Sequence, residues 1–214
     1  MTLLEQISQC LQRGEDDRVA DLVKQTVASG VAAEAILNQG LIAGMNVVGD
    51  QFRVREIFLP DVLMAARAMY AGLDLLKPLL ARDGVPVAGR IVIGSVQGDL
   101  HDIGKNLVAI MLKGAGFEVI DLGHDVPAAR FVDAAVEHDA SIIGLSALLT
   151  TTMPVMQDVI AIVRARGLAA RLRVIVGGAP VTDAWAREIG ADAYAYDAAN
   201  AVERVRTLTA KVAV

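Results

Sequence analysis

The chain has 214 residues, which is enough for one large domain or two small ones. Hydrophobic residues make up 54% of it and charged residues 21%, a balance typical of a globular rather than a disordered protein. The net charge of −5 without a basic block disfavours nucleic-acid binding, and the single cysteine excludes both an intramolecular disulfide and a cysteine-rich zinc site.

Residues 1–82 carry helical periodicity and no convincing strand. The N-terminal segment lacks the basic and apolar regions of a signal peptide, and no stretch reaches the ~18 apolar residues of a membrane helix, so we expect a cytoplasmic protein. Apolar spacing, Gly14, Ser29-Gly30 and Pro60 predict four helices connected by short loops. These helices suggest a small bundle, the first predicted domain, at residues 1–82.

Residues 83–89 are predicted to form a linker, because this segment contains glycine and proline. Residues 90–214 then alternate apolar β-branched runs with helical patterns. Strands are predicted at residues 90–96, 117–122, 141–146, 173–176 and 192–195, each followed by a helix. Continuous apolar strands alternating with helices favour an α/β domain with a parallel five-stranded sheet, in the flavodoxin-like order 2-1-3-4-5.

In such a sheet, ligands bind beyond the carboxyl ends of the strands. The loop after the first predicted strand presents Asp99, His101 and Asp102. It matches neither a dinucleotide-binding glycine pattern nor a P-loop. A histidine between carboxylates can serve as a general base, a metal ligand or a capping residue, and a nearby aspartate that binds one ring nitrogen makes the other a better ligand.

Two further loops at the same edge carry unusual residues. Residues 146–153 contain four hydroxyl side chains, where a helix N-cap needs only one. Gly177-Gly178 follows the fourth predicted strand, where adjacent glycines permit either a tight turn or the close approach of a ligand.

The three loops together form a spaced pattern. The first part, Asp-x-His-x-x-Gly, ends at Gly104. The second part, Ser-x-Leu, begins at Ser146, after 41 intervening residues (105–145). The third part begins at Gly177, after 28 further residues (149–176). This pattern resembles the fingerprint of cobalamin-binding domains of the base-off/His-on type. Segments 44–52 and 57–69 independently resemble the helical cap that precedes the cobalamin domain in methionine synthase. The whole two-part chain is similar to the corrinoid proteins of methanol, methylamine and aryl methyl ether methyltransferase systems.

The resemblance implies that His101 is the lower axial ligand of cobalt, that Asp99 orients its imidazole, and that Thr152 stands where methionine synthase completes the relay with a serine. The implied cofactor-binding residues are Gly98, Asp99, His101, Asp102, Ile103, Gly104, Ser146, Leu148, Thr150, Thr152, Gly177, Gly178 and Ala195, with Phe58, Met64 and Ala68 in the helical half. His124 lies outside the family pattern, and we expect it to be a surface residue.

By the same resemblance, we expect a methyl-carrying subunit rather than a complete enzyme, with cobalamin or a related corrinoid as its cofactor. Its expected partners are a substrate-specific methyltransferase, a second methyltransferase whose acceptor is tetrahydrofolate or a thiol, and a reductive activation protein. The alternative is a cobalamin-dependent sensor or regulatory module. The small subunit of a carbon-skeleton mutase and a flavodoxin-like electron carrier fit less well, because the first has no such cap and the second does not explain the three loops.

Overall fold

The computed structural model describes residues 1–84 and 87–212, which fall into two compact units. One unit contains the described residues up to Val87 together with Gly114–Gly116, and the other contains the remaining described residues from Ala88 onward. Residues 85 and 86 of the predicted linker lie outside the described part of the chain. Among the described residues, no helix is both long and apolar enough to span a membrane.

The first unit is helical, as predicted. A capping box between Thr2 and Glu5 begins its first helix. The predicted third helix contains a π-helical segment, so that one continuous run consists of three elements. The helical elements are α1 (Leu3–Gln12), α2 (Asp16–Ala28), α3 (Ala33–Ala35), η1 (Ile36–Ile42), α4 (Ala43–Arg53) and α5 (Leu59–Asp83). Gly44 allows α1 to approach α4 closely, because a Cβ there would lie 2.9 Å from the carbonyl oxygen of Ser8.

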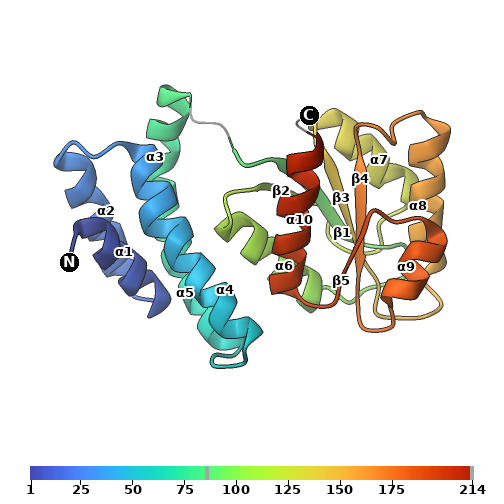
Figure 1. Cartoon of the computed structure of the whole chain (residues 1–214), viewed down its shortest axis with the longest axis horizontal. Helices are drawn as coiled ribbons and strands as arrows, with labels where there is room; N and C mark the ends of the chain where they lie inside the picture. The colour runs from blue at the N-terminus through green and yellow to red at the C-terminus, as the bar shows by residue number, and fades with distance from the viewer. Residues whose placement is uncertain (85–86, 213–214) are drawn as a thin grey trace. The chain divides into compact units, whose positions relative to one another are not determined.

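The second unit is an α/β domain whose five strands are all parallel, in the order β2-β1-β3-β4-β5 (Figure 1). The predicted fold class and strand order are therefore confirmed. The strands are β1 (Arg90–Ser95), β2 (Glu118–Asp121), β3 (Ile142–Ser146), β4 (Arg173–Gly177) and β5 (Ala193–Ala195). The helices are α6 (Ile103–Gly114), α7 (Ala128–Glu137), α8 (Pro154–Ala165), α9 (Asp183–Ile189) and α10 (Ala198–Val212).

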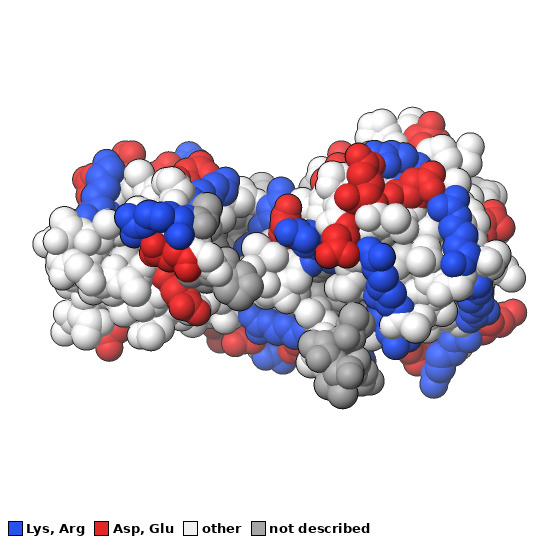
Figure 2. Space-filling view, turned by 90° about the horizontal axis from the view of Figure 1, so that it is seen from above, with Lys and Arg blue, Asp and Glu red and all other residues white. Residues whose placement is uncertain are grey.

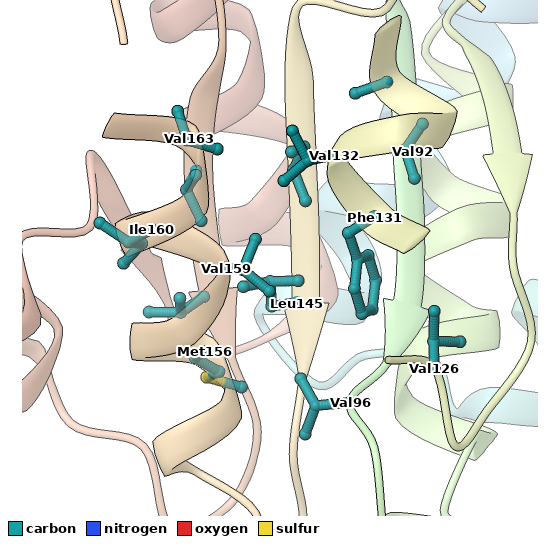
Figure 3. Close-up of a cluster of buried hydrophobic side chains, with 14 of the residues drawn as sticks. Val92, Val96, Val126, Phe131, Val132, Leu145, Met156, Val159, Ile160 and Val163 are labelled. Carbon is teal, nitrogen blue, oxygen red and sulfur yellow. The ribbon is translucent and has the colours of Figure 1, made fainter. Parts of the chain in front are cut away.

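Helices cover both faces of this sheet, with α6 and α10 on one side and α7, α8 and α9 on the other (Figure 1). Alternate residues of β1, β3 and β4 join side chains of α7 and α8 in one buried cluster, in which the ring of Phe131 is fully enclosed (Figure 3). Gly94 makes room for this ring, because a Cβ at that position would lie 2.8 Å from Phe131 Cε1. This core holds the carboxyl ends of the strands in fixed register.

Acidic and basic side chains are interspersed over the face of the molecule seen in Figure 2. Pairs such as Arg171 with Asp139 (2.9 Å) and Arg173 with Asp192 (3.1 Å) neutralise one another on the second unit. No continuous basic surface is formed by the described residues on the face shown.

Replacing Phe131 with alanine should lower the free energy of unfolding of the sheet unit by about 3–5 kcal/mol, because a fully buried ring is lost and a cavity remains. Trp185 packs against the same cluster, so its fluorescence in a urea titration follows this unit. The control is Val136→Ala on the exposed face of α7, with an expected change within about 0.5 kcal/mol. Equal effects of the two substitutions would contradict the assignment of this core.

Candidate functional site

Four small residues form a row across the carboxyl edge of the sheet. Ser95 pairs in register with Ser146, Ser146 with Gly177, and Gly177 with Ala195. Side chains at these positions point away from the Phe131 cluster, toward the face that α6 and α10 cover (Figure 1). Ser146, Gly177 and Ala195, three predicted site residues, are therefore brought together on one face of the sheet.

His101 lies in the loop between β1 and α6, beside the buried carboxylate of Asp99. Its Nδ1 is 2.8 Å from Asp99 Oδ1, and its backbone N–H donates to the same oxygen at 3.1 Å. An ionised carboxylate only accepts hydrogen bonds, so Nδ1 carries the proton. Nε2 makes no hydrogen bond with the described chain, and 52% of the His101 side chain is exposed. The imidazole is thus oriented by one nitrogen and available through the other.

Asp99 is fully buried and accepts five hydrogen bonds. Besides the two from His101, Oδ2 accepts from the backbone N–H groups of Leu148 (2.7 Å) and Leu149 (3.2 Å) and from Thr152 Oγ1 (2.8 Å). Burial by itself raises the pKa of this carboxyl, but the hydrogen bonds from Leu148, His101 and Thr152 outweigh it and hold the pKa well below its ordinary value. Asp99 is therefore an anion at any pH near neutrality.

Thr152 joins the loop after β3 to this carboxylate. Its buried hydroxyl lies 2.8 Å from Asp99 Oδ2 and 2.9 Å from the carbonyl oxygen of Leu149. Both are acceptors and the hydroxyl has one hydrogen, so the ionised carboxylate is the stronger partner. Helix α8 has Met153 as its N-cap without a side-chain capping bond, so Thr152 does not serve as that cap.

The other predicted residues of these two loops differ in exposure. Ile103 is 73% exposed and Leu148 44% exposed, while Thr150 is exposed and Asp102 is half-buried. Gly98 has a left-handed backbone (φ 83°), which favours glycine whatever lies beside it. Gly104, in the first turn of α6, has open space where a Cβ would stand.

The two glycines after β4 have a backbone reason to be glycine. Gly178 has φ 130°, and a Cβ on it would overlap the carbonyl oxygen of Ala147. A Cβ on Gly177 would lie 3.0 Å from the carbonyl oxygen of Ala195. Close packing of neighbouring strands and loops therefore accounts for both residues, and room for a ligand at these positions stays a prediction.

The predicted residues of the helical unit differ from one another in burial. Phe58 is 67% exposed and Met64 48% exposed, whereas Ala68 is fully buried. Phe58 and Met64 offer apolar surface to a ligand or partner, and the assignment of all three to a cofactor site stays a prediction. His124 and His138 are both exposed.

Sequence reasoning missed two groups at this site. Ser95 is buried at the end of β1, and its hydroxyl donates to the carbonyl oxygen of His101 at 2.6 Å. A polar residue ending an apolar strand was the available signal for Ser95. Leu148 and Leu149 bind Asp99 through their backbone N–H groups, and a main-chain donor leaves no signal in residue identity.

Comparisons with known proteins identify the family of the chain. Residues 89–206 match the family described as B12 binding domain, and residues 3–77 match a second family with the same description. The chain is 46% identical over 206 residues to dimethylamine corrinoid protein 3 of Methanosarcina acetivorans, with 96% of each chain covered.

Two solved structures are similar over nearly the whole chain. A cobalamin-binding protein from Desulfitobacterium hafniense is 34% identical with a TM-score of 0.79, covering 96% of this chain and 98% of that one. A chain of the methanol:cobalamin methyltransferase complex from Methanosarcina barkeri is 30% identical with a TM-score of 0.87, covering 97% of this chain and 80% of that one.

Replacing Asp99 with asparagine should destabilise the apoprotein by about 2–4 kcal/mol at pH 7, because an amide group would then face N–H and O–H donors. The lowered pKa means that the carboxylate stabilises the fold at any pH above its ordinary value, near 4, and that this contribution is lost as the pH falls through the lowered value.

Urea unfolding at several pH values measures the difference in free energy of unfolding between the wild type and Asp99→Asn. This difference should become smaller toward pH 3. Asp102→Asn, in the same loop but outside this hydrogen-bond network, is the control, with an expected change within about 0.5 kcal/mol. Equal stability of Asp99→Asn and the wild type at pH 7 would refute the role of the carboxylate in holding the two loops.

Proposed function

The chain belongs to the family of corrinoid proteins with B12-binding domains, and from this premise we propose that it binds a corrinoid and carries a methyl group within a methyltransferase system. One observation carries the proposal: His101, at the carboxyl edge of the sheet, has one ring nitrogen fixed by a buried carboxylate and the other free. The bound cofactor supplies a cobalt atom that can accept and release a methyl group.

The donor chemistry of these residues fits a base-off/His-on corrinoid. A neutral imidazole with its proton fixed on Nδ1 presents Nε2 as a ligand, and a carboxylate on Nδ1 raises the basicity of Nε2. Thr152 supplies a hydroxyl proton to the far oxygen of the same carboxylate at 2.8 Å. We propose that Thr152, Asp99 and His101 act as a relay in which the hydrogen bonds to the Asp99 carboxylate set how strongly it draws on the Nδ1 proton, and hence how strongly Nε2 would bind the metal.

We place the nucleotide tail on the face of the sheet that carries Ser95, Ser146, Gly177 and Ala195. The side chains at these four positions are small, so little protrudes from the sheet at its carboxyl edge. Gly104 belongs to the first turn of α6, the helix on this side of the sheet (Figure 1), and has open space where a Cβ would stand. Ile103 lies two residues after His101, and Leu148 binds Asp99 through its N–H; the exposed side chains of both add apolar surface, which favours contact with a large flat ligand.

The methyl donor and acceptor sites are assigned to partner proteins. The described residues form a helical unit and a single α/β unit, and the one constellation we find in them is that of a cofactor carrier. We propose a substrate-specific methyltransferase as the first partner, in line with the methanol:cobalamin methyltransferase complex that contains a similar chain. A second methyltransferase, acting on tetrahydrofolate or a thiol, and a reductive activation protein complete the proposed system. The regulatory alternative has no comparable support among these relatives.

Replacing His101 with alanine should remove axial imidazole coordination while corrinoid binding persists. The measurement is the electron paramagnetic resonance spectrum of the cobalt(II) form, in which nitrogen splitting from the lower ligand should be present in the wild type and absent in the variant. His124→Ala, which changes an exposed histidine of a neighbouring loop, is the control and should keep the splitting. Unchanged splitting in His101→Ala would refute the ligand role.

A leucine at Gly104 should weaken cobalamin binding about 10–100-fold by filling the space assigned to the tail. Binding of cobinamide, which lacks the tail, should not change. Leucine is a better helix former than glycine, so the apoprotein should not lose stability, unlike a Gly178 variant, in which the backbone itself would clash. Equal loss of affinity for both corrinoids would move the tail away from this face.

A further inference from the structure

Asp125, in the loop after β2, contacts the loop that carries His101 twice. Its backbone N–H donates to the carbonyl oxygen of Asp99 at 3.0 Å, and its carboxylate Oδ1 accepts from the backbone N–H of Gly98 at 2.7 Å. Neither contact involves the hydrogen bonds between Asp99 and the loop after β3. The His101 loop is therefore held from two sides, by the Asp99 carboxylate on one and by Asp125 on the other.

The backbone of Asp125 is left-handed, with φ 55°. A residue with a Cβ is strained in this conformation, although aspartate and asparagine tolerate it better than most. Asp139 has a similar φ of 51°, but it follows the end of α7, where a left-handed residue commonly ends a helix. Asp125 ends no helix, so its conformation needs another cause, and the two contacts with Gly98 and Asp99 provide one.

The surrounding backbone fixes Asp125 against the end of β1. Val126 forms a parallel bridge with Val96, its N–H donates to the carbonyl oxygen of Ser95 at 3.1 Å, and the N–H of Ser95 donates to Gly123 at 2.9 Å. The loop after β2 thus runs alongside β1 up to the residue before the His101 loop. This arrangement leaves Asp125 little freedom to move relative to Gly98.

The end of β2 fixes the other end of the His101 segment. Lys105 in the first turn of α6 has a side chain only 2% exposed, and its Nζ lies 2.6 Å from both carboxylate oxygens of Asp121. Asp121 in turn accepts from the N–H of Gly123 at 2.9 Å. The segment between Gly98 and Lys105, with His101 inside it, is therefore attached at both ends to residues 121–125.

We propose that Asp125 is a positioning residue for His101, acting through the backbone of Gly98 and Asp99 to fix where the imidazole stands above the sheet. The inference rests on the proposed function, since His101 is taken as the axial ligand. The two contacts of Asp125 with the His101 loop go to the backbone of Gly98 and Asp99, so the effect of Asp125 passes through that loop. The carboxylate of Asp125 then matters for coordination rather than for folding.

Three variants separate the carboxylate from the backbone conformation. Asp125→Gly keeps the left-handed conformation without strain and removes the carboxylate, whereas Asp125→Asn keeps an amide oxygen that can accept from Gly98. Asp139→Gly is the matched control, because Asp139 shares the backbone conformation and pairs instead with Arg90 and Arg171.

The measurement on the cobalamin-loaded protein is the ratio of nitrogen-coordinated to uncoordinated cobalt(II) by electron paramagnetic resonance. Asp125→Gly should lower this ratio about tenfold, the lower end of the range for groups that orient a metal ligand. Asp125→Asn and Asp139→Gly should keep the wild-type ratio. In the apoprotein, amide exchange at Gly98 should be faster in Asp125→Gly alone.

A wild-type ratio in Asp125→Gly, or an equal loss in Asp125→Asn or Asp139→Gly, would overturn the positioning role. Absence of nitrogen splitting in the wild-type spectrum would instead overturn the role of His101 as the axial ligand. The role of Asp125 in positioning that ligand would then fall with it. The apoprotein exchange result distinguishes these failures, because it tests the attachment of the loop without any cofactor.

Discussion

The site depends on one buried anion. Asp99 has no exposed surface, and a carboxylate in that position is tolerated only because five donors surround it. Two of these donors belong to His101 and three to the loop after β3, so the requirement to satisfy a single charge joins two loops from neighbouring strands. The imidazole takes its orientation from this requirement. The parallel sheet contributes by ending β1 and β3 in register, with Ser95 opposite Ser146, so that both loops start from the same edge.

The backbone around His101 is held rigidly, while the imidazole ring itself stays accessible to a ligand. Asp99 is enclosed, Ser95 holds the carbonyl oxygen of His101, and Lys105 is buried against Asp121, yet half of the His101 side chain remains exposed. Hydrogen bonds and an ion pair therefore fix the backbone on both sides of the histidine without covering its ring. A side chain that must bind a large molecule in one defined orientation benefits from such an arrangement, since its own orientation is established before binding.

Much of the fold and part of the site were predictable from the sequence. Short runs between helical patterns, most of them apolar and β-branched, predicted all five strands, because a sheet covered on both faces needs continuous apolar residues. The spacing of Asp99 and His101, and the hydroxyls near Thr152, predicted groups that do meet at one edge. The donors from Leu148 and Leu149 could not be predicted, because main-chain N–H groups are independent of residue type. Gly178 shows the converse difficulty, since a glycine required by the backbone and one required by a ligand look alike in a sequence.

Asp125 illustrates why a spaced motif captures only one side of such a site. A motif records residues whose side chains touch the ligand or the residue that binds it, and the contacts of Asp125 go to the backbone of Gly98 and Asp99. Several side chains can accept a hydrogen bond from a backbone N–H. The residue type at such a position is therefore weakly constrained, whereas its backbone conformation is strongly constrained. Its mark in the structure is the left-handed conformation of a non-glycine residue away from any helix end. In this protein the second support of the His101 loop therefore lies at a strained backbone position in the loop after the neighbouring strand, and not among further members of the motif.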